Sequence, residues 1–290
     1  MTVLAKRSKS LVKAGSRVPT LRTLDDAGPH VDLDQVFNLS KLYARTIDTS
    51  HDETIARMGV WHPSAAGMCK RAQVLQYTRV MPTDRQSRHV KEIFKIGHVI
   101  HDLVQTALEK TPAVMQPYGV NVEVQREAPC NRETDTLFLK YGIAGTADML
   151  LRLHNDLFEQ RGVVEIKSIG DEKFKEVKKQ ESPLTPHLMQ ANVYAYRFDC
   201  PIIWMFYFNK NNQKREVFTL MFDLFYFDLA IGYFEECADF VTRGQLPPRQ
   251  EDYLHCSDCV YRSMCDPVIL RARTGMLQAP RNLIRRRKKP

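Results

Sequence analysis

Apolar residues recur at the spacing of an α-helix in several long segments of the chain. The clearest segment is 88–110, which we predict to be an amphipathic helix whose apolar stripe packs on the core: Ile93, Ile96, Ile100, Leu103, Val104, Ala107 and Leu108. The segment 34–60 has the same spacing at Val36, Leu39, Leu42 and Tyr43. Further helices are predicted just after residue 68 and over 172–180, 186–198 and 223–244, the last with Gly244 as its C-cap.

Between these helical segments, the period changes to the alternation of a β-strand. Four runs, which we predict to form a mostly antiparallel meander, cover 120–127, 135–141, 143–153 and 162–168. A hairpin is predicted from 201–208 and 215–222 around a polar turn. Helices before, between and after these strands predict an α/β fold with a central mixed β-sheet flanked by helices.

Composition and charge divide the chain into three parts. The 290 residues are 43% hydrophobic, and no apolar run approaches the length of about 20 residues that crosses a bilayer. The net charge of +8 combines +6 in residues 1–24, +6 in residues 281–290 and −4 between them. We therefore predict a disordered basic arm over 1–33, a single domain over 34–270 and a basic tail over 271–290. Such tails are typical of contact with a polyanion, although two solvated tails remain the alternative.

The N-terminus lacks the apolar region of a secretory signal, so we expect an intracellular protein with no membrane association. An organelle-targeting role for the basic arm stays open. The seven cysteines are an odd number, which argues against a secreted disulfide scaffold. We expect a reducing compartment, such as bacterial or host cytoplasm, in which the three cysteines crowded into 256–265 indicate metal or cluster ligation.

The run VVEIKS in the predicted strand 162–168 carries two charges among apolar residues. Because residues i and i+2 of a strand face the same side, Glu165 and Lys167 point together and Ile166 points to the opposite layer. Asp148 lies 17 residues earlier, and two carboxylates that converge from adjacent strands resist ionisation unless a divalent cation joins them. Oxygen ligands favour Mg²⁺ or Mn²⁺, and such a site suits phosphodiester hydrolysis. The alternative is an ion pair at a sheet edge.

The ordered set of motifs GHVIH, GTADML, VVEIKS and HLMQANVY resembles the PD-(D/E)XK nuclease superfamily in its RecB-like branch. The resemblance implies a restriction-endonuclease-like core in which Asp148, Glu165 and Lys167 are catalytic. It also implies that Mg²⁺ or Mn²⁺ is bound by His101, Asp148, Glu165 and the backbone carbonyl of Ile166. Gln190 and Tyr194 would contact DNA or shape the site, and Lys70, Arg71 and Lys173 are further candidates for contact with the DNA backbone.

The cysteines extend this resemblance to the iron–sulfur nucleases of the same branch, the AddB nuclease domain and the CRISPR-associated exonucleases of the Cas-four type. In those proteins one cysteine before the core and three after it hold a 4Fe-4S cluster, which implies a cluster on Cys69, Cys256, Cys259 and Cys265. It would staple the two ends of the domain together; zinc is the alternative metal. Cys130, Cys200 and Cys237 fit small buried residues instead.

The function implied is a metal-dependent DNA exonuclease on single-stranded ends, in recombination, repair or phage DNA processing. A 5′ to 3′ polarity is favoured by analogy alone. The alternatives are a structure-specific endonuclease and a non-catalytic DNA-binding or adaptor module in CRISPR adaptation or a replication complex. The presence of Asp148, Glu165 and Lys167 together favours the enzyme.

Overall fold

The computed structural model describes residue 43 and residues 57–130, 134–250 and 256–265. The chain divides into two compact units, Met1–Thr46 and Ile47–Pro290, and only the exposed, helical Tyr43 is described in the first. Both predicted basic tails and most of the predicted helix over 34–60 lie outside the described residues. The prediction that this helix reaches residue 60 is wrong, because residues 57–59 form a turn.

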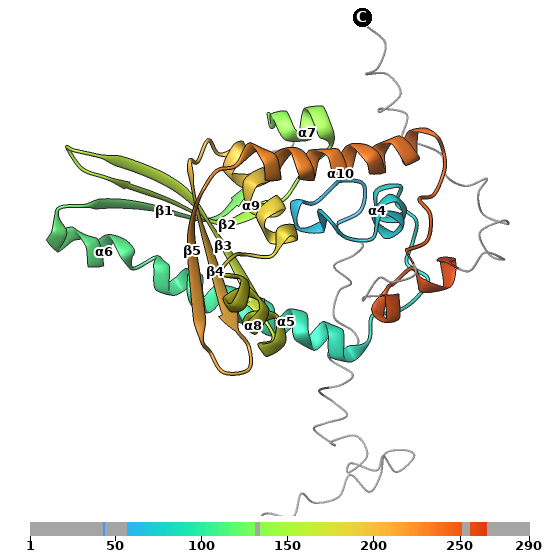
Figure 1. Cartoon of the computed structure of the whole chain (residues 1–290), viewed down its shortest axis with the longest axis horizontal. Helices are drawn as coiled ribbons and strands as arrows, with labels where there is room; N and C mark the ends of the chain where they lie inside the picture. The colour runs from blue at the N-terminus through green and yellow to red at the C-terminus, as the bar shows by residue number, and fades with distance from the viewer. Residues whose placement is uncertain (1–42, 44–56, 131–133, 251–255, 266–290) are drawn as a thin grey trace, which may run out of the picture. The chain divides into compact units, whose positions relative to one another are not determined.

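A mixed sheet of five strands in the order β1-β2-β3-β4-β5 forms the centre of the second unit (Figure 1). All neighbouring strands pair antiparallel except β3 and β4, which pair parallel. The parallel pair follows from the helical connection between them, since parallel neighbours need a long crossover. The fold is therefore α/β with a mixed sheet, as the sequence predicts. The strands are β1 (Asn121–Pro129), β2 (Thr146–His154), β3 (Glu159–Ile169), β4 (Ile202–Asn209) and β5 (Arg215–Met221).

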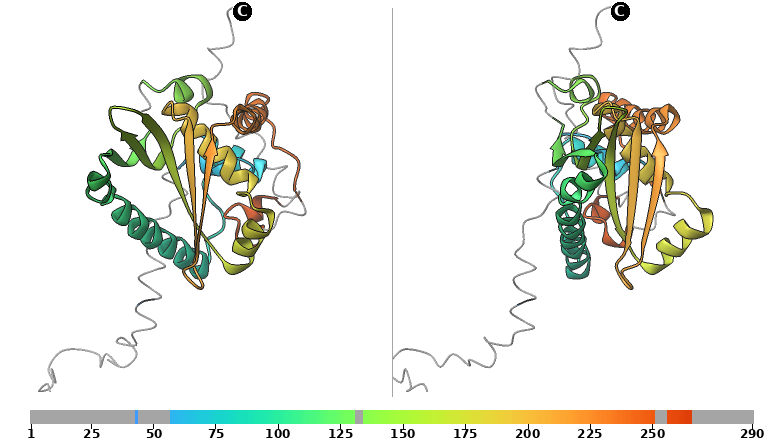
Figure 2. Two further views of the ribbon diagram at one scale, coloured as in Figure 1. Left: turned by 60° about the vertical axis from the view of Figure 1, so that its left-hand side comes forward. Right: turned by 90° about the vertical axis from the view of Figure 1, so that its left-hand side faces the viewer.

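Helices cover both faces of this sheet (Figures 1 and 2). One face packs against α5 (Arg88–Leu108), and the other against α8 (Asp171–Gln180) and α9 (Thr185–Arg197). A long helix, α10 (Leu224–Thr242), packs on α9 and α4. Its C-cap is Arg243, and the predicted C-cap Gly244 follows one residue later with φ +64°. The remaining elements are η1 (Pro63–Ala65), α4 (Lys70–Tyr77), α6 (Thr111–Met115), η2 (Gln116–Tyr118), α7 (Thr136–Tyr141), η3 (Cys256–Asp258) and η4 (Arg262–Cys265).

The strand predicted over 135–141 is wrong, because this segment forms the short helix α7. The Asp135 side chain caps the helix by accepting a hydrogen bond from the Leu137 N–H at 2.8 Å. Gly142 ends it with φ +71°, a backbone conformation that glycine adopts without strain. The predicted meander therefore has three strands, and Asp135 and Gly142 decide the local structure through capping rather than through alternation.

The predicted apolar stripe of α5 is only partly correct. Ile100 and Val104 are buried against the sheet, and Leu108 packs beside them. Ile96 and Leu103, in contrast, are 52% and 59% exposed, and Ile93 and Ala107 are exposed as well. The stripe is wider than the side of the helix that the sheet can cover, so only its inner half is buried. No helix in the described part of the chain is both long and apolar enough to cross a membrane.

Candidate functional site

Asp148 lies where β2 separates from β3. The last paired residues of these strands are Met149 and Val164. Beyond them, a hydrogen bond of the Asp148 side chain connects the two strands. Its Oδ2 accepts a hydrogen bond from the Ile166 N–H at 2.7 Å. The strand that carries Asp148 is thus the neighbour of the strand that carries Glu165, which is the arrangement that the predicted site requires.

Glu165, Lys167 and Gln190 form a closed set of hydrogen bonds on the α9 face of the sheet. Lys167 Nζ is 2.7 Å from Glu165 Oε1 and donates to Gln190 Oε1 at 2.7 Å. Gln190 Nε2 in turn donates to Glu165 Oε1 at 2.6 Å. The alternation of β3 places these charges on one side, while Val164 and Ile166 enter the apolar cluster beneath α5. The polar side chains are therefore held in fixed orientations by a strand and a helix.

The Glu165 carboxylate is buried and incompletely satisfied. It is 1% exposed, and its Oε2 has no hydrogen-bond partner among the residues that the structure describes. Burial raises the pKa of this carboxyl from 4.5 to about 7, with Lys167 opposing the shift and the negative charge of Asp148 adding to it. An orphaned carboxylate oxygen near a second carboxylate is unfavourable unless a cation neutralises both. Carboxylate oxygens are the ligand type that Mg²⁺ and Mn²⁺ prefer, so the free oxygen is chemically suited to such an ion.

His101 approaches the same place from α5. Its Nδ1 is 3.3 Å from Asp148 Oδ1, and both side chains are partly exposed. Gly97, one turn earlier, faces β3, where a Cβ would come 3.3 Å from Ser168 Oγ. The glycine thus allows the close approach of α5 that carries His101 to the carboxylates.

The sequence did not indicate Gln105, which holds the backbone of Asp148, or Glu127, which accepts a hydrogen bond from Gln105. Gln105 is buried one turn after His101, and its Nε2 donates to the Asp148 carbonyl at 2.9 Å and to Glu127 Oε1 at 2.7 Å. Glu127 has φ +50° at a gap in the β1–β2 pairing. The available signal was the spacing of Gln105 from His101, since i and i+4 share a helix face.

The metal ligands remain predictions. Across residues 57–130, 134–250 and 256–265, no three His, Cys, Asp or Glu side chains are already arranged to hold a metal ion. Glu165 Oε1 is turned toward Lys167 and Gln190, while Oε2 is available. Ile166 contributes its N–H to Asp148, and the role predicted for its carbonyl oxygen is untested.

Gln190 and Tyr194 are 7% and 3% exposed. A Cβ on Gly145 would come 2.6 Å from the Tyr194 hydroxyl, so Tyr194 packs tightly against the segment that leads into Asp148. Of the two roles that the resemblance offers, burial favours shaping of the site over contact with DNA. Lys173 is exposed on α8.

Lys70 and Arg71 engage the protein itself. Lys70 pairs with Glu236 of α10, and Arg71 Nε donates to the Pro247 carbonyl at 2.9 Å. These contacts tie α4 to α10 and the segment after it. A predicted contact of either residue with DNA would therefore have to compete with an intramolecular partner.

The four cysteines of the predicted cluster lie in one region. Cys69 is the N-cap of α4, and the segment 256–265 docks there through Val260, Tyr261 and Met264 against Leu75. Burial raises the pKa of the Cys259 thiol, and the neighbouring Cys265, Cys69 and Cys256 raise it further. Cys69 and Cys259 therefore influence each other although they are far apart in the sequence, and the iron–sulfur staple stays a prediction.

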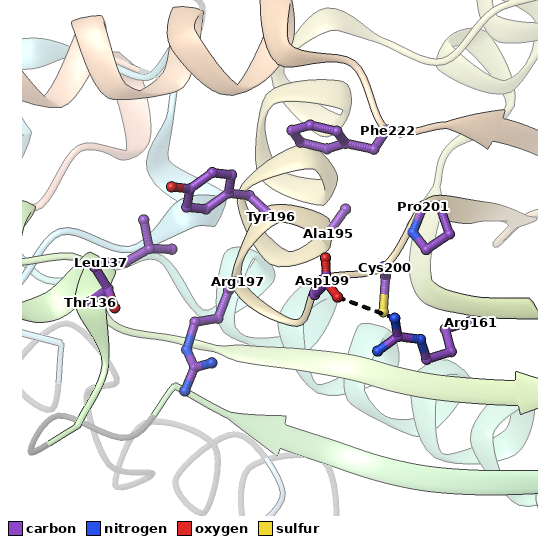
Figure 3. A pocket seen from close by; sticks show the side chains of 10 residues that line it. All are labelled: Thr136, Leu137, Arg161, Ala195, Tyr196, Arg197, Asp199, Cys200, Pro201 and Phe222. Atoms are coloured by element: carbon purple, nitrogen blue, oxygen red, sulfur yellow. Dashed lines mark hydrogen bonds and ion pairs between the residues drawn. The ribbon is translucent and has the colours of Figure 1, made fainter.

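A cavity of about 650 Å³ lies elsewhere in the fold (Figure 3). It opens where β3 and β4 begin and α9 ends, and none of its lining residues belongs to the predicted site: Thr136, Leu137, Arg161, Ala195, Tyr196, Arg197, Asp199, Cys200, Pro201 and Phe222. Figure 3 shows the Arg161 guanidinium directed at Asp199, which it pairs with at 3.1 Å. The cavity and the carboxylates are therefore separate features.

No curated protein and no protein-family model matches this sequence. The solved structure of SSO0001 is similar at 18% identity and a TM-score of 0.40, over 81% of this chain and 96% of that chain. The alkaline exonuclease LHK-Exo from Laribacter hongkongensis is similar at 14% identity and a TM-score of 0.34, over 67% of this chain and 97% of that chain. The structure of LHK-Exo in complex with dAMP is similar at 15% identity and a TM-score of 0.34, over 66% of this chain and 95% of that chain. Nothing about the function of this chain follows from likeness at this level.

Proposed function

We propose that the protein is a metal-dependent deoxyribonuclease that hydrolyses phosphodiester bonds. The observation that carries the proposal is the buried Glu165 carboxylate, whose orphaned Oε2 lies in a site shared with Asp148, His101 and Lys167. Asp148, Glu165 and His101 would hold Mg²⁺ or Mn²⁺, together with the carbonyl of Ile166. The bound ion supplies Lewis acidity toward a phosphoryl oxygen and makes a bound water more acidic.

The chain's own groups prepare the site for this chemistry. Gln190 accepts from Lys167 and donates to Glu165, so it fixes the ammonium group and the carboxylate relative to each other. The Lys167 side chain remains 16% exposed, so its Nζ can still reach a water or a phosphoryl oxygen. There it would orient the attacking water or stabilise the charge that develops on the phosphate. The Ile166 N–H holds Asp148 in place from β3.

The substrate we infer is DNA, with single-stranded ends cleaved exonucleolytically and preferably from 5′ to 3′. Support comes from the ordered motifs of the RecB-like branch and from Lys173, which is exposed on α8. The alternatives are a structure-specific endonuclease and a DNA-binding adaptor without activity. The intact set of Asp148, Glu165 and Lys167 favours the enzyme over the adaptor.

Digestion of end-labelled single-stranded DNA in the presence of Mn²⁺ tests this proposal. The wild-type protein should shorten the DNA from an end, EDTA should stop it, and Asp148→Ala should be inactive although folded. A covalently closed single-stranded circle distinguishes the two enzymes, because an exonuclease leaves it intact. Equal digestion by the wild type and Asp148→Ala would contradict the site, and a folded, metal-loaded wild type that binds but does not cut would support the adaptor.

We further infer that Cys69, Cys256, Cys259 and Cys265 hold a 4Fe-4S cluster, with Zn²⁺ as the alternative. Four thiolates from α4 and the segment 256–265 form a suitable ligand set, and the Cys259 thiol already lies under the influence of the other three. The ligands would join two segments far apart in sequence and so restrict the unfolded chain.

The metal content of anaerobically purified protein tests the cluster. We expect about four iron atoms per chain, a visible absorption band that dithionite bleaches, and loss of both in Cys69→Ser. Cys200→Ala is the matched control, because Cys200 packs in the apolar cluster with α8 and α9, apart from the cluster that contains Cys259, and its loss should leave the iron content unchanged. Stoichiometric zinc in a colourless protein would favour the alternative.

A further inference from the structure

His187 is a polar residue near the candidate site for which the proposed chemistry has no use. It lies in the first turn of α9, three residues before Gln190 and seven before Tyr194, so all three share one face of the helix. The side chain is half-buried. Within the described residues, its side-chain hydrogen bond and its ring contact are both with Tyr207 of β4, whose side chain is completely buried.

The hydrogen bonds around Tyr207 fix the position of the proton on His187. The Leu184 N–H donates to the Tyr207 hydroxyl at 3.1 Å, and this hydroxyl lies 2.8 Å from His187 Nδ1. The hydroxyl has one proton, and in the described part of the chain Nδ1 is the one acceptor within reach. Tyr207 therefore donates to Nδ1, and the neutral imidazole carries its own proton on Nε2. Burial lowers the pKa of His187 from 6.5 to about 3, so the ring stays neutral.

The His187 ring is within electrostatic reach of the catalytic lysine, Lys167. Tyr207 is the register partner of Lys167 in the parallel β3–β4 pair, and Tyr207 holds His187 on the same face of the sheet. The positive charges of Lys167 and of Lys173 on α8 both contribute to the low pKa of His187. Within the described residues no hydrogen bond to Nε2 is present, and the ring is under the influence of two cations, one in the site and one on α8.

We propose that His187 Nε2–H donates a hydrogen bond to a phosphate oxygen of the single-stranded DNA, one position away from the scissile phosphate, on the path from Lys167 to Lys173. The inference rests on the proposed function and adds a substrate contact to it. A neutral donor strengthens binding without displacing counterions, so it acts differently from a lysine. Tyr207 is the positioning residue that holds the imidazole in the tautomer that this contact needs.

Two substitutions separate the contact from a structural role. His187→Asn places its Oδ1 where Nδ1 was, so it keeps the acceptor for Tyr207 and loses the distal donor. His187→Gln places its Nε2 where the ring Nε2 was, so it keeps the donor and loses the acceptor. If His187 contacts DNA, Asn should bind DNA more weakly than Gln; if it only supports Tyr207, the order should be reversed.

The measurement is fluorescence anisotropy of a labelled single-stranded oligonucleotide with the full chain in EDTA, repeated over a range of salt concentrations. We expect His187→Asn to raise Kd about tenfold without changing the slope of log Kd against log salt. Lys173→Ala, the matched control for a charged contact, should lower that slope by about one. Under digestion conditions His187→Asn should raise KM more than it lowers kcat.

Three results would overturn the contact. These are unchanged Kd in His187→Asn, weaker binding by His187→Gln than by His187→Asn, and a reduced salt slope in His187→Asn, which would mean that a cation was lost. A wild type that binds no DNA would instead refute the proposed function and this contact with it. Unfolding temperatures of both variants identify any loss of binding that comes from misfolding.

Discussion

Asp135 and Glu165 are both buried carboxylates, at 0% and 1% exposure, yet their surroundings differ. Both oxygens of Asp135 are used: Oδ1 accepts from the Leu137 N–H at 2.8 Å, and Oδ2 pairs with Arg197. Glu165 concentrates its contacts on Oε1 and leaves Oε2 without a partner in the described residues. Asp135 therefore connects α7 to α9, whereas Glu165 has one oxygen that can still accept a hydrogen bond or bind a cation.

Completeness of hydrogen bonding separates a structural buried acid from a functional one. A buried charge is costly unless its hydrogen bonds are complete, so a stabilising acid should resemble Asp135. An acid that remains incomplete in a well-packed sheet is expected to bind something from outside. The following predictions test this contrast, beginning with the largest effect.

Glu165→Gln should lower nuclease activity by about 10³-fold or more, because several kcal/mol of charge stabilisation in the transition state are lost. The amide can still accept from Lys167 and Gln190 through Oε1, so the unfolding temperature should change little. Rates on labelled DNA and thermal unfolding, measured on the same preparation, check both expectations. Retained activity would show that Glu165 is a structural acid like Asp135.

Asp135→Asn should have the opposite profile. It breaks the pair with Arg197, whose side chain is 27% exposed, so we expect a loss of about 3 kcal/mol or less in the free energy of unfolding. The activity per folded molecule should stay at the wild-type level, since the partners of Asp135 are Leu137 and Arg197, and neither belongs to the candidate site. Urea unfolding monitored by circular dichroism measures the first quantity. An inactive but stable Asp135→Asn would contradict the contrast.

Gln105→Met should lower activity about tenfold, because the Asp148 backbone loses a buried donor and a small displacement of a catalytic group is costly. Methionine preserves the volume and the packing beneath α5. The reduction should appear in kcat with the Kd for DNA unchanged, which distinguishes a positioning role from a binding role. Gln105→Glu keeps the shape of the side chain but cannot donate a hydrogen bond when it is ionised. This second variant should be no more active than Gln105→Met.

The pH dependence of stability should show the smallest effect. His187 has its pKa lowered from 6.5 to about 3, so the unfolded chain binds its proton first as the pH falls. Stability should therefore decrease as the pH drops below 6.5 toward 3, by about 1.4 kcal/mol at one unit below the ordinary pKa. His187→Asn keeps the Tyr207 contact and should remove this component, as denaturant unfolding at several pH values would measure. An identical pH profile in both proteins would contradict the burial of a neutral ring.

Much of the fold and part of the site followed from local patterns. Alternation in VVEIKS predicted that Glu165 and Lys167 face one side and Ile166 the other, and both expectations are met. The hairpin of β4 and β5 and the helices over 172–180 and 186–198 also formed where periodicity placed them. These features depend on residues a few positions apart, which is the range over which strand and helix periods act.

Other features depended on which segments became neighbours. The run 135–141 alternates like a strand, but the Asp135 cap and its pair with Arg197 of α9 select a helix. Half of the α5 stripe stays exposed because the sheet covers only the side with Ile100 and Val104. Periodicity shows which residues of a helix lie together, but it cannot show how wide the opposing surface is.

Local patterns in the sequence are enough to order the chemical groups and to assign the faces on which they lie: His101, Asp148, Glu165, Lys167 and Gln190. Three features came from the folded arrangement alone. Within the described residues one Glu165 oxygen has no partner, Gln105 holds Asp148, and Tyr207 fixes the proton of His187. Burial and hydrogen-bond partners depend on contacts between elements far apart in the sequence, which local patterns do not contain.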